Sequence, residues 1–396
     1  MTDLSFRAEH EPRRRRRRLR WVSFTPRFVT MLISGVATFG LLGTMLVLPL
    51  PYAVQGAGPT FNTLAGHRPA DQGDSDEVGD GEPTLISIEG GRAHPAAGEL
   101  RLTTVVTSGG PGYPVRAANV IVGYWSSNQM VQPLEAAIDP DLTQEQRDQL
   151  AAQQMITSQE HATVAALTDV GFEVPAVLEV VDAAPGTGAE GVVAEGDLIL
   201  GIQAPGEQVA QVETYADLSV PLLATPPGEE MRLLVERDGQ EVTLPIITTD
   251  DGRGRSQLGI FLNADFDMPV EVSIAIDNVG GPSAGLMFAL GIIDVLTPED
   301  LTGGHSIAGT GTISLDGRVG PIGGVGLKMI GAVDDGADYF LTPALNCSEV
   351  VGHIPTGLQV IAVDTLEQAR SAVESIAAGD TDDLPGCADW EHLEPT

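Results

Sequence analysis

The chain has 396 residues, enough for two or more domains, and its 21 basic and 55 acidic side chains give a formal net charge of −34. Residues 1–27 hold nine arginines and three acidic residues, so the remainder has 12 basic and 52 acidic residues, a balance of −40. Such a surface repels phosphate backbones, which argues against a nucleic-acid partner. Pro and Gly occur without a regular period, which excludes a collagen-like repeat.

An uncharged stretch from Phe28 to Leu50 follows the arginine run RRRRRRLR at 13–20. As a helix it would span about 34 Å, enough to cross a hydrocarbon core of about 30 Å. Arginines before the span predict that residues 1–27 are cytoplasmic and that the C-terminal domains are extracellular. A cleaved signal peptide is the alternative, but its apolar core is usually about 7–15 residues long. We therefore expect one uncleaved, single-pass transmembrane anchor in the cell membrane.

The segment after the span predicts a linker and then regular structure. Residues 65–83 are rich in Gly, Pro and Asp, so we assign 51–83 to a flexible linker. Strand-like alternation follows between 84 and 107. Residues 141–168 lack Pro and Gly and are rich in Gln, Glu and Ala, which predicts a helix.

Residues 171–248 have a different pattern, with short apolar strands, a Gly196-Asp197 turn and a hairpin at Asp238-Gly239. This stretch resembles a PDZ domain of the bacterial protease-associated kind. PDZ domains bind an extended peptide by adding it as a strand to a sheet edge. The resemblance places the carboxylate-binding loop at Gly171 and Phe172. A small β domain without a ligand is the alternative.

From residue 252 onward, strands and helices alternate. The segment PSAGLMFALGIIDVL is apolar nearly all round, which predicts a buried helix. The segment GVGLKMIGAVDDG predicts a second helix, over about 324–335, and DYFLTP predicts a strand after it. The last twenty residues are acidic and are expected to form a loosely held tail.

Ser283 is a candidate nucleophile because it follows a glycine pair and Pro282 where the buried helix is expected to begin. Pro fits the first helical position. Free N–H groups at a helix start can stabilise a developing oxyanion, so we expect the backbone of Gly281, Pro282 and Ala284 to do so. The segment also satisfies G-x-S-x-G, the pattern of α/β-hydrolases, in which a histidine would be the base. An ordinary serine in a first helical turn is a third interpretation.

Lys328 is the only lysine in the chain, beside twenty arginines. On a helix its neighbours three and four residues away are Gly324, Val325, Gly331 and Ala332, none of them acidic. A buried lysine can lose its proton and act as a base, whereas arginine stays charged. A high-G+C coding bias would also leave few lysines, but the apolar neighbours favour a base that serves Ser283.

Residues from about 255 to 375 resemble the proteolytic domain of Lon-type peptidases. The resemblance rests on GPSAG, which holds that family's serine, and on GTISLDGRVGPIGGVGLK, which leads into the helix with its lysine. It implies that Ser283 is the nucleophile and Lys328 the general base. The whole chain resembles the membrane-anchored PDZ-and-Lon-domain proteases of Gram-positive bacteria. Many Lon domains have an acidic residue directly before GPSAG, where this chain has Gly280.

The expected fold class is mixed α/β: a Lon-type proteolytic domain with an inserted PDZ-like β domain, preceded by one transmembrane helix. The expected segments are 1–27 cytoplasmic, 28–50 anchor, 51–83 linker, 84–168 N-terminal part of the Lon-like domain, 169–250 PDZ-like, 251–376 Lon-type proteolytic, and 377–396 acidic tail.

The expected function is ATP-independent serine endopeptidase cleavage of secreted or membrane proteins presented by the PDZ domain. The resemblance implies a homo-oligomer, for example a hexamer. No cofactor is expected, because a Walker A motif needs Lys followed by Ser or Thr and Lys328 precedes Met329. No metal is expected either, because the seven histidines lack ligand spacing. The alternatives are a catalytically silent PDZ scaffold and a G-x-S-x-G esterase that uses Ser283 and a histidine.

The two cysteines, Cys347 and Cys387, lie in the part of the chain expected outside the cell. A cysteine pair can oxidise there, so we expect a disulfide between them, with two free thiols as the alternative.

Overall fold

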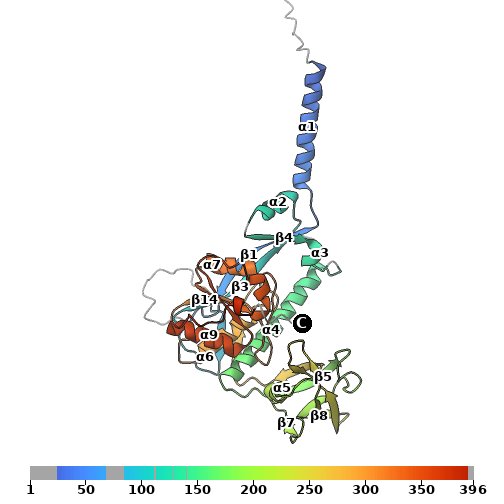
Figure 1. The fold of residues 1–396 in the computed structure, drawn as a ribbon, viewed down its shortest axis with the longest axis vertical. Coiled ribbons are helices and arrows are strands. Elements are labelled where there is room, and N and C mark those ends of the chain that lie inside the picture. The colour runs from blue at the N-terminus through green and yellow to red at the C-terminus, as the bar shows by residue number, and fades with distance from the viewer. Residues whose placement is uncertain (1–24, 68–83, 111–112, 127, 140, 391–396) are drawn as a thin grey trace, which may run out of the picture.

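The computed structural model describes residues 25–67, 84–110, 113–126, 128–139 and 141–390. It has a long N-terminal helix, an α/β unit and a smaller β-rich module (Figure 1). The arginine run at 13–20, residues 68–83 of the expected linker and the last six residues lie outside the described part.

The N-terminal helix α1 (Pro26–Val47) extends away from the rest of the protein (Figure 1). Its stretch Pro26–Thr44 has a mean hydropathy of 1.4, and none of it is buried. The helix is therefore long and apolar enough to span a membrane.

The α/β unit is built on a six-stranded mixed sheet in the order β18-β17-β14-β3-β1-β4. The pairings from β3 through β14 and β17 to β18 are parallel, whereas β1 pairs antiparallel with both β3 and β4. The sheet thus combines strands from before and after the module. Its strands are β1 (Tyr52–Asn62), β3 (Glu99–Ser108), β4 (Gln129–Pro133), β14 (Ser306–Gly309), β17 (Tyr339–Pro343) and β18 (Gln359–Val363).

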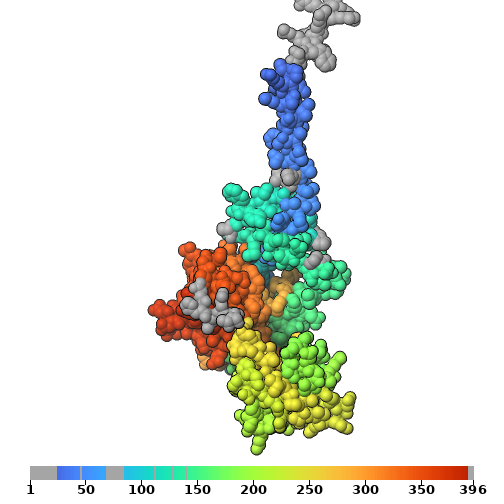
Figure 2. Space-filling model, turned by 45° about the vertical axis from the view of Figure 1, so that its right-hand side comes forward, coloured from blue at the N-terminus to red at the C-terminus, as the bar shows by residue number. Residues whose placement is uncertain are grey.

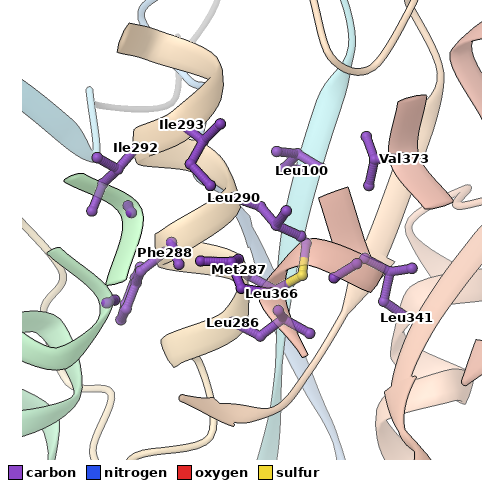
Figure 3. Close-up of a cluster of buried hydrophobic side chains, with 14 of the residues drawn as sticks. Leu100, Leu286, Met287, Phe288, Leu290, Ile292, Ile293, Leu341, Leu366 and Val373 are labelled. Carbon is purple, nitrogen blue, oxygen red and sulfur yellow. The ribbon is translucent and has the colours of Figure 1, made fainter. Parts of the chain in front are cut away.

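Helices cover both faces of this sheet. On one face, α6 is buried along almost its whole length, as its uninterrupted apolar sequence predicts. Figure 3 shows Phe288 and Ile292 directed toward α4, with Leu290 on the side of Leu100 and Val373. On the other face, α7 and α8 pack over β14, β17 and β18. The helices are α2 (Ala117–Trp125), α3 (Leu134–Ala137), α4 (Gln144–Asp169), α6 (Gly285–Leu296), α7 (Val325–Asp334), α8 (Cys347–Val350) and α9 (Leu366–Ala378).

The expected linker 51–83 is wrong at its start, because residues 52–62 form β1 inside the sheet. The linker was predicted from the composition of 65–83, whereas the small residues of 52–62 allow close packing within the sheet. A Cβ at Gly58 would lie 2.3 Å from the Thr104 Oγ1, and a Cβ at Gly331 on α7 would lie 3.2 Å from the Gly58 oxygen. Only a residue without a side chain fits between these neighbours.

The module has its own core and a sheet in the order β12-β5-β6-β8-β9, with β7 paired to β6 and α5 packed against it. The predicted boundary at 250 is wrong, because β12 pairs with β5 from Ile260 to Phe266. The paired residues of β5 and β12 thus lie about eighty positions apart in the sequence. The elements are β5 (Ala176–Ala183), β6 (Leu198–Gln203), β7 (Ala210–Gln211), α5 (Tyr215–Ala224), β8 (Glu230–Arg237), β9 (Gln240–Ile247) and β12 (Ile260–Phe266).

The Gly196-Asp197 turn has a structural role in this module. Asp197 is fully buried and accepts two hydrogen bonds of 2.6 Å from the guanidinium of Arg237. These hydrogen bonds lower the pKa of the Asp197 carboxyl below its usual value. The pair ties the turn before β6 to the end of β8.

Ion pairs connect the module's last loop to the α/β unit. Arg253 and Arg255 approach the carboxylate of Asp364 at 3.8 and 3.5 Å, and Arg318 approaches Asp251 at 3.5 Å.

The remaining strands form three short two-stranded pairs. They are β2 (Ile86–Glu89) with β13 (Glu271–Ile274), β10 (Thr249–Asp250) with β11 (Ser256–Gln257), and β15 (Thr312–Ile313) with β16 (Val319–Gly320).

The C-terminal segment is held more firmly than a loose tail. Helix α9 runs on to Ala378, and the 3₁₀ turn η2 (Cys387–Asp389) packs into the core beneath α7. Cys387 is bonded to Cys347, which follows the short turn η1 (Ala344–Asn346). Both cysteines are buried, so the disulfide and its apolar surroundings keep residues up to 390 on the domain.

Candidate active site

Ser283 lies in a turn immediately before α6. Its carbonyl oxygen accepts hydrogen bonds from the Gly311 N–H (2.9 Å) and the Thr310 Oγ1 (3.0 Å). The expectation that Pro282 occupies the first helical position is wrong, because the helix begins at Gly285. Gly281, with φ of +88°, turns the chain before the helix.

Helix α4 holds the segment that precedes the serine. The Gly281 N–H donates to the Ala151 oxygen at 3.0 Å, and the Ser158 Oγ donates to the Pro282 oxygen at 3.0 Å. A Cβ at Gly280 would lie 2.8 Å from the Ala151 Cβ. The close approach of the two backbones explains the glycine at position 280.

Of the three residues expected to stabilise an oxyanion, two cannot donate into the cleft from their backbone. Pro282 has no N–H, and the Gly281 N–H is already bonded to α4. Ala284, directly after Ser283, stays as the predicted donor.

Lys328 lies on α7, which comes well after Ser283 in the sequence. In the fold, its side chain approaches Ser283 from the opposite side of the cleft. Its Nζ lies 2.7 Å from the Ser283 Oγ and 2.9 Å from the Thr310 Oγ1. The lysine side chain is only 3% exposed. Gly324 caps α7 in the left-handed conformation (φ +72°), which lets the Gly323-Gly324 turn lead directly into the helix that carries the lysine.

Burial lowers the pKa of Lys328 from 10.5 to about 8, because the buried ammonium loses its hydration. The contacts of its Nζ are hydroxyl groups, which do not carry the negative charge that would restore the protonated form. A lysine of this kind is a fair base near neutral pH.

Ser283 and Lys328 open onto a cleft of about 740 Å³. The cleft runs between the strands β1 and β3 on one side and the segment 277–284 on the other. Its apolar lining includes Phe61, Leu102, Val105, Met155, Val279 and Ile322.

The described histidines lie away from this cleft. No histidine among the described residues lines it. His305 packs edge-on against Tyr339, His353 is exposed, and His392 is outside the described part. The geometry therefore does not favour the esterase alternative. In the same part of the chain, no group of three or more His, Cys, Asp or Glu side chains could hold a metal ion.

Gly171 and Phe172 lie at the C-terminal end of α4. Neither residue lines the cleft that contains Ser283 and Lys328. The Phe172 N–H donates to the Leu167 oxygen (2.9 Å), so the two residues close the helix. The following strand, β5, is paired on both sides, by β12 and β6. Because β5 meets β6 at the single pair Glu179–Leu198, the assignment of Gly171 and Phe172 to a peptide-binding loop stays a prediction.

Comparison with known proteins finds similarity over the part of the chain that contains these features. Residues 264–374 match the Lon protease (S16) C-terminal proteolytic domain. The matched segment contains Ser283 and Lys328, and its similarity to this protease domain supports a serine peptidase.

Curated relatives match in the same way. The chain is 32% identical over 141 residues to the Lon protease of Campylobacter concisus, covering 35% of this chain and 17% of that protein. It is 34% identical over 110 residues to Lon protease 2 of Bacillus subtilis, covering 28% of this chain and 19% of the relative. The chain thus spans less than a fifth of the length of these relatives.

Among solved structures, the PDZ domain of the SdrC-like protein from Listeria innocua is 18% identical, with a TM-score of 0.20, and the match covers 22% of this chain and 93% of that domain. The corresponding domain from Listeria monocytogenes is 20% identical, with a TM-score of 0.19, covering 22% of this chain and 85% of that domain.

The sequence interpretation missed two residues beside Ser283 and Lys328, namely Thr310 and Ser158. Thr310 bonds both Lys328 and the Ser283 carbonyl, whereas Ser158 holds the Pro282 carbonyl. A threonine between glycines and a serine within a polar helix carry no pattern that marks such roles.

Proposed function

We propose that this chain is a membrane-anchored, ATP-independent serine endopeptidase in which Ser283 is the nucleophile and Lys328 the general base. The observation that carries the proposal is the 2.7 Å contact between the Ser283 Oγ and a buried lysine whose pKa is lowered. Nucleophile and base within hydrogen-bond reach are the requirement for covalent catalysis by serine.

The reaction follows from this geometry. The neutral Lys328 amine takes the proton of the Ser283 hydroxyl as Oγ attacks the substrate carbonyl. The Ala284 N–H stabilises the oxyanion of the tetrahedral intermediate. The lysine ammonium then gives its proton to the leaving amine, and the acyl-enzyme is hydrolysed by a water that Lys328 activates. Thr310 holds the Nζ in line with the serine throughout.

The proposal also includes the location of the chain and its independence of ATP. Helix α1 anchors the chain in the cell membrane, residues 1–27 stay in the cytoplasm, and the domains from β1 onward face outward. The Cys347–Cys387 disulfide supports this orientation, because disulfides persist in oxidising compartments. Lys328 is the only lysine and Met329 follows it, so the chain has no Walker A motif and we assign no ATP requirement.

We assign peptide presentation to the module, as a PDZ-like domain, and propose the edge of β12 as the strand that the peptide extends, beside the predicted loop at Gly171 and Phe172. Within the described chain, β12 is an edge strand of the module's sheet. An extended tail of a secreted or membrane protein would pair with this edge. The resemblance to Lon-type proteases further supports a homo-oligomer, of which a hexamer is the expected form.

Cleavage of casein by the purified full chain tests the enzymatic proposal. We expect Ser283→Ala and Lys328→Arg to be folded and to lose activity to a similar degree, because arginine cannot become the base. Thr310→Val should reduce kcat about tenfold, the effect of one lost hydrogen bond at the reacting groups, and Thr310→Ser should restore it.

A chain without peptidase activity that still binds tails would instead be the silent scaffold. Activity that survives Lys328→Arg but disappears in His353→Ala would indicate the esterase alternative and end the Ser–Lys proposal.

A further inference from the structure

Helix α2 (Ala117–Trp125) is apolar on two opposite sides. One side is buried through Val120 and Gly123, and a Cβ on Gly123 would lie 2.5 Å from the Val131 Cγ2 of β4. The opposite side is exposed: Ile121 is 53%, Val122 is 61% and Trp125 is 89% accessible. At 3.6 residues per turn these three side chains share one face.

An exposed helix face of a soluble protein is normally polar. The nine residues of α2 include no charged side chain, although the chain beyond residue 27 carries 52 acidic residues. Tyr113, just before the helix, and Tyr124 within it are each 69% exposed. This concentration of exposed aliphatic and aromatic side chains needs an apolar or interfacial partner.

The position of α2 in the fold identifies that partner. Pro49, two residues after α1, forms a β-bridge with Arg116, the residue before α2. The Leu50 N–H also donates to the Val115 oxygen at 2.9 Å. Both views show α2 directly beside the lower end of α1 (Figures 1 and 2).

The depth of α2 follows from the length of the anchor. The apolar stretch of α1 ends at Thr44, so Pro49 lies at the level of the lipid headgroups when this stretch fills the hydrocarbon core. A β-bridge holds Arg116 about 5 Å from Pro49. Helix α2 therefore starts in the headgroup region, where Trp and Tyr are enriched and where amphipathic helices bury their apolar faces.

We propose that α2 lies in the membrane interface, with Ile121, Val122 and Trp125 inserted among the lipids of the leaflet from which α1 emerges. The proposal rests on the proposed anchoring by α1. A lipid surface covers this face, and not a second copy of the chain. The β-bridge between Arg116 and Pro49 holds α2 at the level of the headgroups.

The test uses the full chain in lipid nanodiscs, with Trp21→Phe and Trp390→Phe so that Trp125 is the single emitter. We expect Trp125 to emit at shorter wavelength than a tryptophan in water. Its emission should be quenched by lipids brominated near the carbonyl end of the acyl chain, and less by lipids brominated near the methyl end. Val122→Asp should reduce the quenching and leave casein hydrolysis unchanged.

The matched control is Val220→Trp, on α5 of the module, in a chain that also carries Trp125→Phe. Val220 is 64% exposed and far from α1 in sequence and in the fold. Its emission should be unaffected by brominated lipids.

Three results would overturn the proposal. Unquenched Trp125 in a chain that stays in the disc removes the lipid contact but leaves the anchor. Trp125 that is shielded from aqueous acrylamide and insensitive to bromine assigns the face to another copy of the chain. A chain that elutes apart from the disc removes the anchor, and this inference falls with it.

Discussion

At the residue scale, the decisive feature is the set of groups around the only lysine. The Nζ of Lys328 contacts two hydroxyl groups, Ser283 and Thr310, in a protein with 55 acidic residues. An adjacent carboxylate would raise the lysine pKa, whereas burial alone lowers it to about 8. The site therefore favours the neutral amine at a pH where most lysines are charged.

The pH profile should report this lysine. In the proposed mechanism the neutral amine is the active form, so kcat/KM for a fluorogenic peptide should rise about tenfold per pH unit below pH 8 and then level off. At pH 7 about one molecule in ten is active, if the pKa is 8. An activity that is flat between pH 6 and 9 would contradict this assignment, as would a rise that continues beyond pH 10.

Asp294 is the second unusual residue. It is 1% exposed in the last turn of α6, and neither carboxylate oxygen makes a hydrogen bond of normal geometry among the described residues. Burial, with a smaller contribution from nearby Asp300, raises the pKa of its carboxyl to about 7. The folded protein thus holds a proton that the unfolded chain releases above about pH 4.

Asp294→Asn should therefore change the pH dependence of stability. Because the folded pKa lies above the unfolded value, the wild-type protein loses stability as the pH rises from about 4 to 7, by at most about 4 kcal/mol. Asparagine does not titrate, so the Tm of the variant relative to wild type should increase between pH 5 and pH 8. Parallel Tm curves for the two proteins over this range would exclude a raised pKa for Asp294. Asp300→Asn, a weaker contributor, is the control.

At the element scale, the helices were the easier part to predict. The second helix was expected over about 324–335 and spans Val325–Asp334, and the buried helix after Ser283 is α6. Both have apolar patterns that depend only on their own sequence. Strand β1 was missed because its glycines permit contact with α7, and β12 was missed because its partner β5 lies about eighty residues earlier.

The candidate site shows the same division. Ser283 and Lys328 could be predicted because each has a local signal, a glycine-flanked serine and a unique lysine. Thr310 could not, because its role depends on the loop after β14 passing between α6 and α7. The oxyanion donors also required the fold, since the hydrogen bond from Gly281 to α4 is set by packing.

The disulfide belongs to this scale because it joins α8 to η2. It closes a loop with a sequence separation of 40 residues, for which chain entropy predicts about 3–4 kcal/mol of stabilisation. The double variant Cys347→Ser with Cys387→Ser should unfold at a lower temperature but keep peptidase activity at 25 °C. Wild-type protein should show the same fall in Tm after reduction, and the variant none. Insensitivity of the wild type to reduction would show that the bond contributes little.

At the scale of the whole molecule, the module joins the proteolytic domain at two neighbouring points of the chain. The Asp267 N–H donates to the Pro175 oxygen at 2.9 Å, and Val174 and Val270 pack in one apolar cluster. A short connection can therefore close the gap that removal of the module would leave.

Deletion of residues 176–266, with a Gly-Ser linker in their place, separates recognition from chemistry. We expect hydrolysis of a short peptide to change little, because the catalytic pair and its supports lie outside the deletion. Cleavage of a protein with a free C-terminal tail should fall by at least about tenfold, since tethering of substrate is lost. The same protein without its tail is the control. Equal loss on the two proteins would leave the module without a role in recognition.

Strand β1 also determines which peptide bonds the enzyme can reach. It begins five residues after α1 ends and lines the cleft at Pro59 and Phe61, with β3 and β4 bonded along its two sides. The seven steps from Tyr52 to Pro59 cover about 23 Å of extended chain. With α1 anchored as proposed, β1 and its two paired strands hold Ser283 at a fixed distance from the membrane surface. Peptide bonds inside the bilayer therefore cannot reach Ser283. A neighbour anchored in the same leaflet must supply an extended stalk of about seven residues before its first cleavable bond.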